Sequence, residues 1–484
     1  MFLGLDIGTS SVKAVLMDGS GGIVEVSSRA LEVSSPHPLW REQNPEDWVT
    51  ATLAVIDDLA ARRPAETAAI RGIGLSGQMH GAVLLDRAGE VLRPAILWND
   101  GRSGEECAIL ERDCPQLHAI AGNLAMPGFT APKLVWVARH EPEIFARVAH
   151  VLLPKAYVRY RLTGEMVEDM SDASGTLWLD VEKRAWSDTI LAATKLTRAN
   201  MPRLVEGSEC SGLLSAGLSQ RWNMASPPIV AGGAGDCAAS AIGLGAITPG
   251  DAFLSLGTSG VLFAVTERFA PNPASAVHAF CHALPKTWHQ MGVMLSSGDS
   301  LAWGARVLGV SERDLLAPLG DVVAGPSPVA FLPYLSGERT PLNDPQATGA
   351  FIGLTNTATR TDLAQAILEG VAFAARANLE ALATAGTSLT AVDLVGGGSR
   401  SHVWAQILAD TLGIPVTRVE EGEVGAALGA ARLGQIAATD APPLDVCTKP
   451  RPIRTYAPRS DAVTAYSDAY RRWSRLYPAL KEAR

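Results

Sequence analysis

The triplet Gly-Thr-Ser occurs twice in the chain, each time between two apolar segments. The residues concerned are Gly8, Thr9, Ser10, Gly257, Thr258 and Ser259. Glycine lets a backbone turn tightly and approach an anion closely, while the N–H and hydroxyl groups of such a turn are hydrogen-bond donors. One copy alone could be an ordinary hairpin turn. Two copies in the same strand–turn–strand setting favour a pair of phosphate-binding turns, in a chain that lacks a GxxxxGK[ST] loop.

Asp6 lies at the end of an apolar strand, just before the first turn. A carboxylate beside a polyphosphate is repelled unless a cation lies between the two. We therefore expect Asp6 to hold Mg²⁺ through water molecules, since magnesium dehydrates reluctantly. The alternative is a strand-end carboxylate that caps the turn. Lys13, on the return strand, is expected to reach a phosphate, the alternative being an exposed side chain.

Asp236 follows an apolar segment and several glycines, and small residues that favour a helix come after it. At a helix N-terminus its ionised form is stabilised, so it can accept a hydrogen bond or a proton from an alcohol. A plain N-cap would use the same placement. Phosphoryl transfer to an alcohol needs a phosphate cradle, a metal and a carboxylate that orients the hydroxyl. Asp236 is therefore predicted to be the acceptor, and Asp6 the residue on the metal side.

A third glycine-rich turn, from Gly396 to Arg400, follows the apolar segment Val392–Val395 and precedes a helical pattern. Gly397, Gly398 and Ser399 are expected to let a base or ribose lie against the backbone. The turn does not have the GxGxxG spacing of a dinucleotide site.

Two polar loops, at positions 77–81 and 97–102, carry side chains suited to a polyol. Trp98 offers a flat apolar face to sugar C–H groups, although core packing would explain it as well. Gln78, His80 and Asp100 can pair with hydroxyl groups. His278 and His282, four residues apart, could suggest a metal pair, but the segment has strand-like composition and no third ligand is evident.

These residues need a scaffold of strands, turns and helices. Positions 2–17 predict a hairpin, 23–33 a third strand, and 70–75 a short buried strand. A helix is predicted from Asn44, because Pro45 and the acidic residues after it suit a helix N-terminus. Glycine-rich positions 422–429 should open another helix, and an amphipathic helix is predicted over 461–484.

The segment DAFLSLGTSGVLFAV repeats the opening FLGLDIGTSSVKAVL in register, which indicates an internal duplication. The chain is therefore predicted to be an α/β protein of two related domains, 1–245 and 246–484. Asp6 corresponds to Ser255 in the second copy, so the two turns are chemically unequal.

A chain of 484 residues with 47% hydrophobic and 19% charged residues is typical of a globular enzyme with more than one domain. The net charge of −9 and the absence of a basic run argue against nucleic-acid binding. Six cysteines without CxxC spacing favour reduced thiols, and neither a signal peptide nor a membrane span is evident. We therefore expect a cytoplasmic protein. The oligomeric state is open, and a homodimer is one option.

The motifs together resemble the FGGY family of carbohydrate kinases, within the hexokinase–Hsp70–actin superfamily. GFTAPKLVW at 128–136 resembles the first family signature, and GAFIGL at 349–354 with DL and AILE after it resembles the second. The resemblance spans nearly the whole chain. It implies two actin-like, ribonuclease H-like domains with ATP and sugar in the cleft between them.

Five segments, among them SGQMHGAVLLD and FLPYLSGERTP, are most similar to the branch of the family that acts on xylulose. That similarity implies transfer of the γ-phosphate of ATP to D-xylulose, with Met79 and His80 contacting the ketose and Asp236 accepting its proton. Cys237 departs from the Asn that is common in this branch, which leaves another ketose or a polyol, such as ribulose, an alditol or glycerol, open as substrate. A second class of function is an actin-like or Hsp70-like ATPase, which would not need the sugar-type loops.

Overall fold

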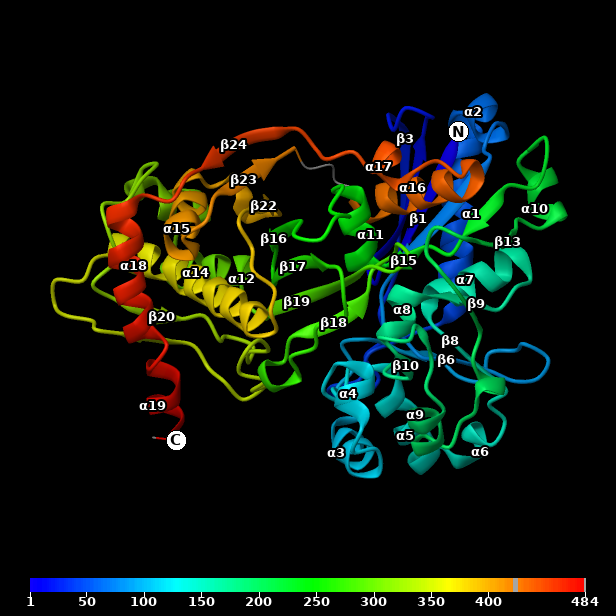
Figure 1. Ribbon diagram of the computed structural model, residues 1–484, viewed down its shortest axis with the longest axis horizontal. Helices are drawn as coiled ribbons and strands as arrows, with labels where there is room; N and C mark the ends of the chain where they lie inside the picture. Colours follow the sequence, from blue (N-terminus) through cyan, green and yellow to red (C-terminus); the bar gives the residue numbers. More distant parts are fainter. Residues whose placement is uncertain (421–424, 483–484) are drawn as a thin grey trace.

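The computed structural model describes residues 1–420 and 425–482, folded into two lobes that are each built on a mixed β-sheet (Figure 1). The first sheet has the order β13-β14-β5-β1-β2-β3, with β15 beside β5. Its strands are β1 (Phe2–Ile7), β2 (Ser11–Met17), β3 (Ile23–Ala30), β5 (Gly72–Gly77), β13 (Cys210–Leu213), β14 (Ile229–Ala231) and β15 (Ala234–Gly235).

The second sheet has the order β18-β19-β17-β16-β22-β23-β24. Its strands are β16 (Ala252–Leu256), β17 (Gly260–Thr266), β18 (His278–Cys281), β19 (Trp288–Met294), β22 (Val392–Val395), β23 (Val416–Val419) and β24 (Pro452–Tyr456).

Strand pairing confirms the predicted duplication. In the first sheet β1 and β2 form an antiparallel hairpin, β3 follows β2, and β5 and then β14 add on the other side in parallel. In the second sheet β16 and β17 form the hairpin, β19 follows β17, and β22 and then β23 add in parallel. Each lobe therefore repeats one five-strand core.

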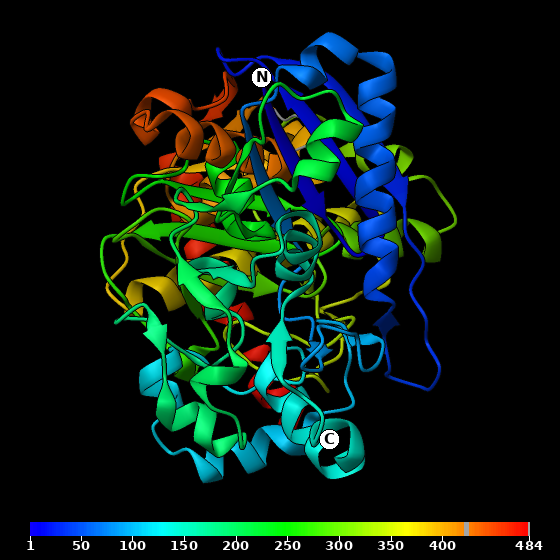
Figure 2. The same ribbon diagram turned by 90° about the vertical axis from the view of Figure 1, so that its right-hand side faces the viewer.

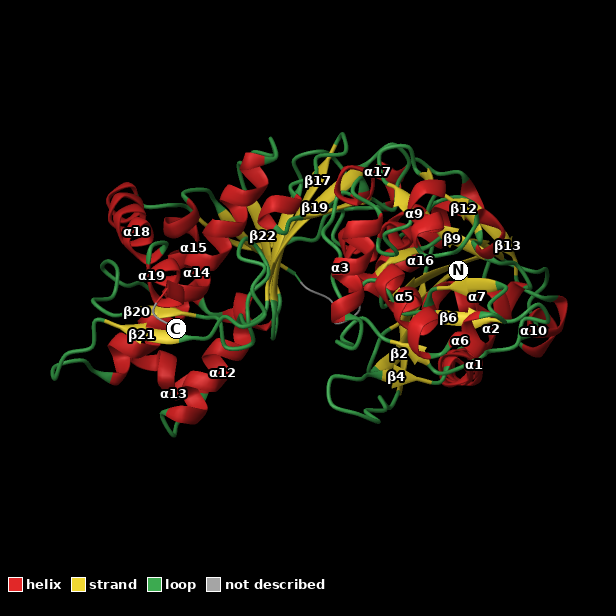
Figure 3. Ribbon diagram, turned by 90° about the horizontal axis from the view of Figure 1, so that it is seen from below, coloured by secondary structure: helices red, strands yellow, loops and turns green. Residues whose placement is uncertain are grey.

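Helices flank the strands of both lobes (Figure 3). Those before β16 are α1 (Pro45–Arg62), α2 (Pro64–Ala68), α3 (Gly104–Asp113), α4 (Leu117–Ala121), α5 (Thr130–His140), α6 (Pro142–Phe145), α7 (Pro154–Thr163), α8 (Met170–Ser174), α9 (Asp188–Ala193), α10 (Ala216–Arg221) and α11 (Asp236–Gly243). Those after it are α12 (Gly298–Val307), α13 (Glu312–Leu316), α14 (Arg360–Thr384), α15 (His402–Leu412), α16 (Gly425–Thr439), α17 (Pro443–Val446), α18 (Ser460–Trp473) and α19 (Leu476–Glu482).

Short strand pairs occupy the connections between these elements. They are β4 (Glu42–Gln43) with β7 (Ala95–Ile96), β6 (Val83–Leu85) with β8 (His150–Leu152), β9 (Val167–Asp169) with β12 (Arg203–Val205), β10 (Leu179–Asp180) with β11 (Ala185–Trp186), and β20 (Ala330–Leu332) with β21 (Ala350–Ile352). None of the helices in the described ranges is long and apolar enough to cross a membrane.

Side chains of β1 alternate between two faces of the first sheet, as the strand period of two requires. Leu3, Leu5 and Ile7 face the core that contains Trp48 of α1, the long helix beside the sheet in Figure 2. The opposite face carries Gly4 and packs against α16, where a Cβ on Gly4 would lie 1.8 Å from the carbonyl oxygen of Ala427. Asp6 has the same parity as Gly4 and therefore lies on the α16 face.

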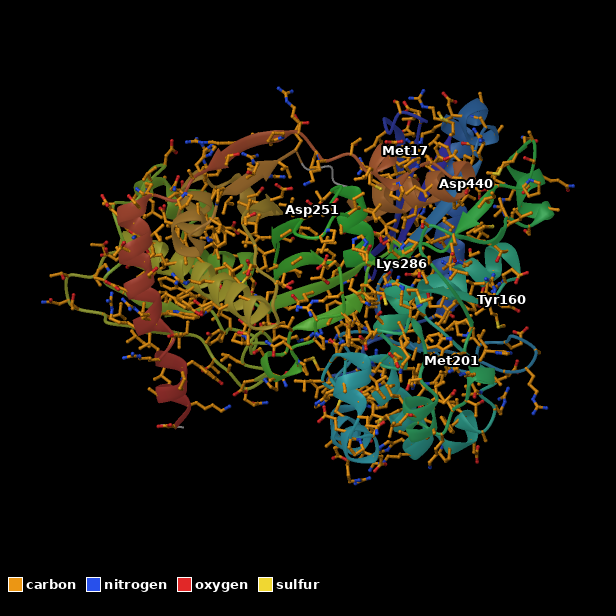
Figure 4. All side chains as sticks on the ribbon, viewed as in Figure 1. Met17, Tyr160, Met201, Asp251, Lys286 and Asp440 are labelled. Atoms are coloured by element: carbon orange, nitrogen blue, oxygen red, sulfur yellow. The ribbon has the colours of Figure 1, made fainter. Side chains whose placement is uncertain are left out.

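Helix α16 belongs to the second half of the sequence but packs on the sheet of the first lobe. Met17 of β2 contacts Ala431 of α16, and Asp440, just after α16, lies on that lobe as well (Figure 4). The chain then crosses back to add β24 to the second sheet. The division predicted at Gly245 follows the sequence order, whereas in space α16, from the second half of the sequence, lies on the first lobe.

Several predicted boundaries are confirmed, and one is corrected. The side chain of Asn44 caps α1 by accepting the N–H of Glu46, and Val392–Val395 is a strand as predicted. The single helix predicted over 461–484 is instead two helices, α18 and α19, in the described residues. Pro478 explains the break, because it cannot donate a hydrogen bond to residue 474 and its ring would clash there. Position 422, the predicted start of the glycine-rich helix, lies outside the described residues.

Candidate active site

Strand register brings the two predicted carboxylates to one edge of the first sheet. Asp6 on β1 pairs with Ser76 on β5, and Ser76 pairs with Ala234 on β15. Asp236 comes two residues after Ala234, as the first residue of α11. These neighbouring parallel strands all end at this edge, where α/β proteins commonly bind ligands.

Asp6 is half-buried and accepts a hydrogen bond of 3.0 Å from the Ser76 hydroxyl. Burial raises the pKa of Asp6, while the Ser76 hydrogen bond and the charge of Lys13 lower it. Lys13 lies directly opposite Asp6 in the β1–β2 hairpin. The predicted position of Lys13 beside the first turn is therefore confirmed, whereas a phosphate contact stays a prediction.

Burial and then the negative charge of Asp6 raise the pKa of Asp236 to about 6. Opposing this, the N–H of Cys237 donates to Oδ1 of Asp236 at 2.7 Å. A carboxylate whose ionisation is disfavoured by a second carboxylate nearby is a suitable setting for a divalent cation, which would relieve the repulsion. Oxygen ligands of this kind suit Mg²⁺, so the residues present fit the predicted ion.

The second Gly-Thr-Ser turn lies against the start of α12. The N–H of Gly298 donates to the carbonyl of Gly257 at 2.7 Å, and the N–H of Ser297 donates to that of Thr258 at 2.9 Å. Thr258 and Ser259 are exposed. The first N–H groups of α12 are thus taken up by the carbonyls of the turn, and they fix the turn's backbone.

The contribution of α12 was not predicted from the sequence. The hydroxyls of Ser296 and Ser297 are buried without a hydrogen-bond partner in the described part of the chain. The signal that could have found them is the run Ser-Ser-Gly-Asp-Ser directly before an amphipathic segment.

The first turn is tied to the predicted sugar loops. The hydroxyl of Thr9 donates to Oε1 of Gln78 at 3.0 Å and accepts the indole N–H of Trp98 at 3.0 Å. Gln43, which the sequence did not suggest, donates to the carbonyl of Thr9 and accepts from Gln78. The Thr9 hydroxyl therefore positions the sugar loops, and the backbone of the turn is left as its donor to a phosphate.

His80 presents one nitrogen as an acceptor. Its Nδ1 lies 2.7 Å from the carbonyl oxygen of Gly175, and burial lowers the pKa of His80 to about 3. A neutral ring must carry its proton on the nitrogen that faces a carbonyl, so Nε2 of His80 holds a lone pair. Lys133, within the first signature, holds this loop by donating to the carbonyl of His80 at 2.8 Å.

The other side chains predicted to contact the sugar differ in how exposed they are. Trp98 is 48% exposed, and Met79 packs against Gly235, where a Cβ would lie 2.8 Å from the Met79 sulfur. Gln78 and Asp100 are buried, and Asp100 accepts from the backbone of Arg41 and from the guanidinium of Arg102. Gln78 and Asp100 therefore shape the loops, while direct contact of either with a sugar stays a prediction.

A cavity of about 1110 Å³ opens between α11, α16 and the second sheet. It brings together Asp236, Cys237, Gly397 and Ser399 of the predicted site, and Arg400 adds a cation. Asp6, Gly398, both Gly-Thr-Ser turns and the sugar loops are not part of its lining. The cavity therefore connects Asp236 with the predicted nucleotide turn, and the sugar loops lie beside it.

The two histidines that could suggest a metal pair each have a hydrogen-bond partner within the protein. Nδ1 of His278 lies 2.9 Å from Oδ1 of Asn123, and Nδ1 of His282 accepts the N–H of Leu284.

All six cysteines are free thiols. Burial, together with the charge of Asp236, raises the pKa of Cys237 well above its usual range.

Comparison with known proteins places the whole chain in one group. The models of the N-terminal and C-terminal domains of the FGGY family of carbohydrate kinases match residues 1–243 and 252–438. Xylulose kinase of Escherichia coli K12 is 49% identical over 482 residues, covering 99% of each chain. The crystal structure of a xyloylose kinase from Brucella ovis superimposes with a TM-score of 0.98 at 55% identity over 100% of both chains. That of xylulose kinase from Rhodospirillum rubrum gives 0.93 at 32% identity over 99% of both. The chain belongs to the FGGY family of carbohydrate kinases.

Proposed function

We propose that the chain transfers the γ-phosphoryl group of ATP to the 5-hydroxyl of D-xylulose, yielding D-xylulose 5-phosphate and ADP. The observation that carries the proposal is the meeting of Asp6 and Asp236 at one sheet edge, beside a phosphate-type turn and sugar-type loops. The names of the relatives, xylulose kinases along their full length, support the choice of substrate.

Asp236 orients the sugar hydroxyl and takes its proton. The hydroxyl oxygen bonds to the γ-phosphorus, the bond from phosphorus to the β–γ bridging oxygen breaks, and ADP leaves with that electron pair. Because the transition state is loose, the proton moves late, and Asp236 acts first by positioning. Its place at the start of α11 favours the ionised form that this role requires.

Backbone N–H groups of the Gly257–Ser259 turn bind the phosphates, and the N–H groups of Ser297 and Gly298, before and at the start of α12, hold that turn in place by donating to its carbonyls. Gly397 and Ser399 line the cavity and lie against the nucleoside, while Gly398 packs against Leu256 and Trp404. Asp6 would hold Mg²⁺, which supplies positive charge to the transferring phosphoryl group when bound. Ser76 keeps the Asp6 carboxylate in place through its hydroxyl.

The sugar lies between the loops at 77–81 and 97–102. Nε2 of His80 accepts one sugar hydroxyl, and the exposed face of Trp98 covers its C–H groups. Cys237, beside Asp236, is a weak hydrogen-bonding group where an amide would both donate and accept. A ketose or polyol other than D-xylulose is therefore the second candidate substrate.

Measurement of ADP release against a panel of pentuloses, hexuloses, alditols and glycerol tests the substrate. The highest kcat/KM is expected for D-xylulose. A higher value for glycerol or an alditol would overturn the substrate while leaving the phosphotransfer in place. Cys237→Asn is the matched variant, and its effect on the ranking reports whether this side chain reads the sugar.

A further inference from the structure

A cluster of buried charges lies beside the loop that presents Asp236. Among the described residues, oxygen atoms of Glu168, Asp169 and Asp172 lie within 4.8 Å of one another, an arrangement that resembles a cation site. Nζ of Lys155 lies 2.6 Å from Glu168, 2.8 Å from Asp169 and 3.5 Å from Asp172. All four side chains are at most 1% exposed. The lysine ammonium therefore takes the place of a metal ion, and the cluster is an internal anchor.

The anchor reaches the loop through Ser171. Asp169 is the N-cap of α8, and its Oδ2 accepts the N–H of Ser171 at 2.8 Å and the Ser171 hydroxyl at 2.5 Å. The oxygen of that hydroxyl then accepts the N–H of Gly235 at 3.1 Å. Gly235 is the residue directly before Asp236. An unbroken chain of contacts thus runs from Lys155 to the backbone that carries the catalytic carboxylate.

A second contact from the same cluster holds the other end of the loop. Arg159 is fully buried, and burial lowers its pKa, while the charges of Glu168, Asp169 and Asp172 oppose that shift. Its guanidinium donates to the carbonyl of Val167 at 2.6 Å and to the carbonyl of Gly232. The loop from Gly232 to Gly235 is therefore fixed at its first and last residues.

The last two residues of this segment form β15, which pairs with β5, and the N–H groups of Gly232 and Gly233 donate to the carbonyls of Glu209 and Gly207. Three of its four residues are glycines, and Gly233 has a φ of +72°, which side-chain-bearing residues rarely adopt. Ser171 and Arg159 add side-chain contacts to these backbone contacts, and the Ser171 contact is the one next to Asp236. A displacement of about 1 Å in a catalytic group can reduce a rate by about 100-fold.

We infer that Ser171, held by Asp169 and Lys155, is a positioning residue of the proposed phosphoryl transfer. Its hydroxyl fixes the N–H of Gly235 and so directs the Asp236 carboxylate at the sugar hydroxyl. The inference rests on the proposed function, and it assigns the Lys155 cluster a catalytic purpose in addition to its part in the fold.

Steady-state kinetics of Ser171→Ala and Ser171→Cys test the role. Both variants remove a good acceptor for the Gly235 N–H, and the cysteine keeps nearly the same volume. A fall in kcat of at least tenfold is expected for Ser171→Ala and a similar fall for Ser171→Cys. The KM values for ATP and sugar should stay within twofold, because the described contacts of Ser171 include neither predicted binding turn.

Ser211→Ala is the matched control. The Ser211 hydroxyl is also buried, and it donates to the carbonyls of Val230 and Ala231, on the strand that leads into the loop. This variant should lower the melting temperature about as much as Ser171→Ala while keeping kcat within twofold of the wild type. Equal losses of kcat in the two variants would reduce Ser171 to a structural residue and overturn the inference.

Two variants distinguish a failure of the role inferred for Ser171 from a failure of the proposed function. If Ser171→Ala does not fold, the nearly isosteric Ser171→Cys carries the test, and a wild-type kcat in that variant would also overturn the inference. Asp236→Asn, assayed beside them, tests the proposed function itself. Loss of activity in Asp236→Asn with full activity in Ser171→Ala would reject the anchor alone.

Discussion

Asp6 and Asp236 lie near one edge of the first sheet, close enough for the charge of Asp6 to raise the pKa of Asp236, but they belong to different elements. Asp6 is part of a strand next to a phosphate-type turn and shares the hairpin with Lys13. Asp236 begins a helix and lines the cavity that holds the nucleotide turn. We therefore propose that Asp236, at the start of the helix, accepts the hydrogen bond of the sugar hydroxyl and that Asp6, on the strand, lies on the side of the cation.

Asp236→Asn should lower kcat by about 10³-fold, within the 10²–10⁴ range that general-base groups contribute, because an amide cannot accept the hydroxyl proton. The KM for ATP should change by less than about threefold, since the phosphate-binding turns are untouched. Initial-rate kinetics check this. Asp188→Asn, at an exposed carboxylate on α9, is the control and should leave kcat unchanged. Turnover near that of the wild type in Asp236→Asn would remove Asp236 from the mechanism.

Glu338 makes the stability of the fold depend on pH. The residue is 2% exposed, and burial raises its pKa from 4.5 to about 7, although the N–H groups of Leu295 and Arg339 donate to it. The folded state thus holds the proton more tightly than the unfolded state. Its contribution to stability is full below pH 4.5 and is lost as the pH rises through 7.

Glu338→Gln should remove this dependence. Between pH 4.5 and pH 8 the free energy of unfolding of the variant should gain about 3 kcal/mol relative to the wild type, from a pKa difference of about 2.5 units. Urea unfolding at several pH values measures it, with Glu312→Gln on the exposed start of α13 as control. Parallel curves for Glu338→Gln and the wild type would contradict the assignment.

At the scale of elements, the contact of α16 with the first sheet depends on glycines in both partners. A Cβ on Gly74 of β5 would lie 1.8 Å from the carbonyl oxygen of Ala430 in α16. The backbone of α16 cannot move aside at that distance in the way that the end of a flexible side chain could. This close approach lets α16 cover the sheet face that carries Asp6.

Gly74→Ala should destabilise the protein by about 3 kcal/mol or more, because overpacking against backbone forces α16 away from β5. Gly217→Ala, in α10 with open space around it, should be neutral or stabilising by up to about 1 kcal/mol. Thermal unfolding of both variants compares them. Similar melting temperatures for the two would show that α16 does not pack as described.

The sequence predicted the elements whose signals are local. The two hairpins, the cap at Asn44 and the strand before Gly396 depend on neighbouring residues, and they are found where expected. The break before α19 also has a local signal, Pro478. Local patterns therefore sufficed for the frame of the site.

Contacts between distant segments were not predictable in the same way. Nothing near Thr9 shows that its hydroxyl binds Gln78 and Trp98, and nothing in α16 shows which sheet it covers. The placement of Ser297 beside Thr258 likewise depends on how α12 packs against the hairpin. Such positions are set by tertiary packing, which a single sequence pattern does not encode.

At the scale of the whole molecule, the duplication gives two lobes with the same core strands. The residues proposed for the reaction differ between the two lobes. The first lobe contributes Asp6, Asp236 and the sugar loops, and the second contributes Thr258, α12 and the turn at Gly397. We propose that the reaction between sugar and nucleotide takes place where these two sets of residues meet. Excluding water from that space matters, because water competes with the sugar for the phosphoryl group.

The most direct test of the account is ³¹P NMR of the full chain with ATP, Mg²⁺ and D-xylulose. We predict that a sugar phosphomonoester and ADP appear in equal amounts, and that ADP formation falls at least a hundredfold when the sugar is omitted. ADP formed at the same rate without sugar, with inorganic phosphate as the other product, would contradict the account and identify the chain as an ATPase.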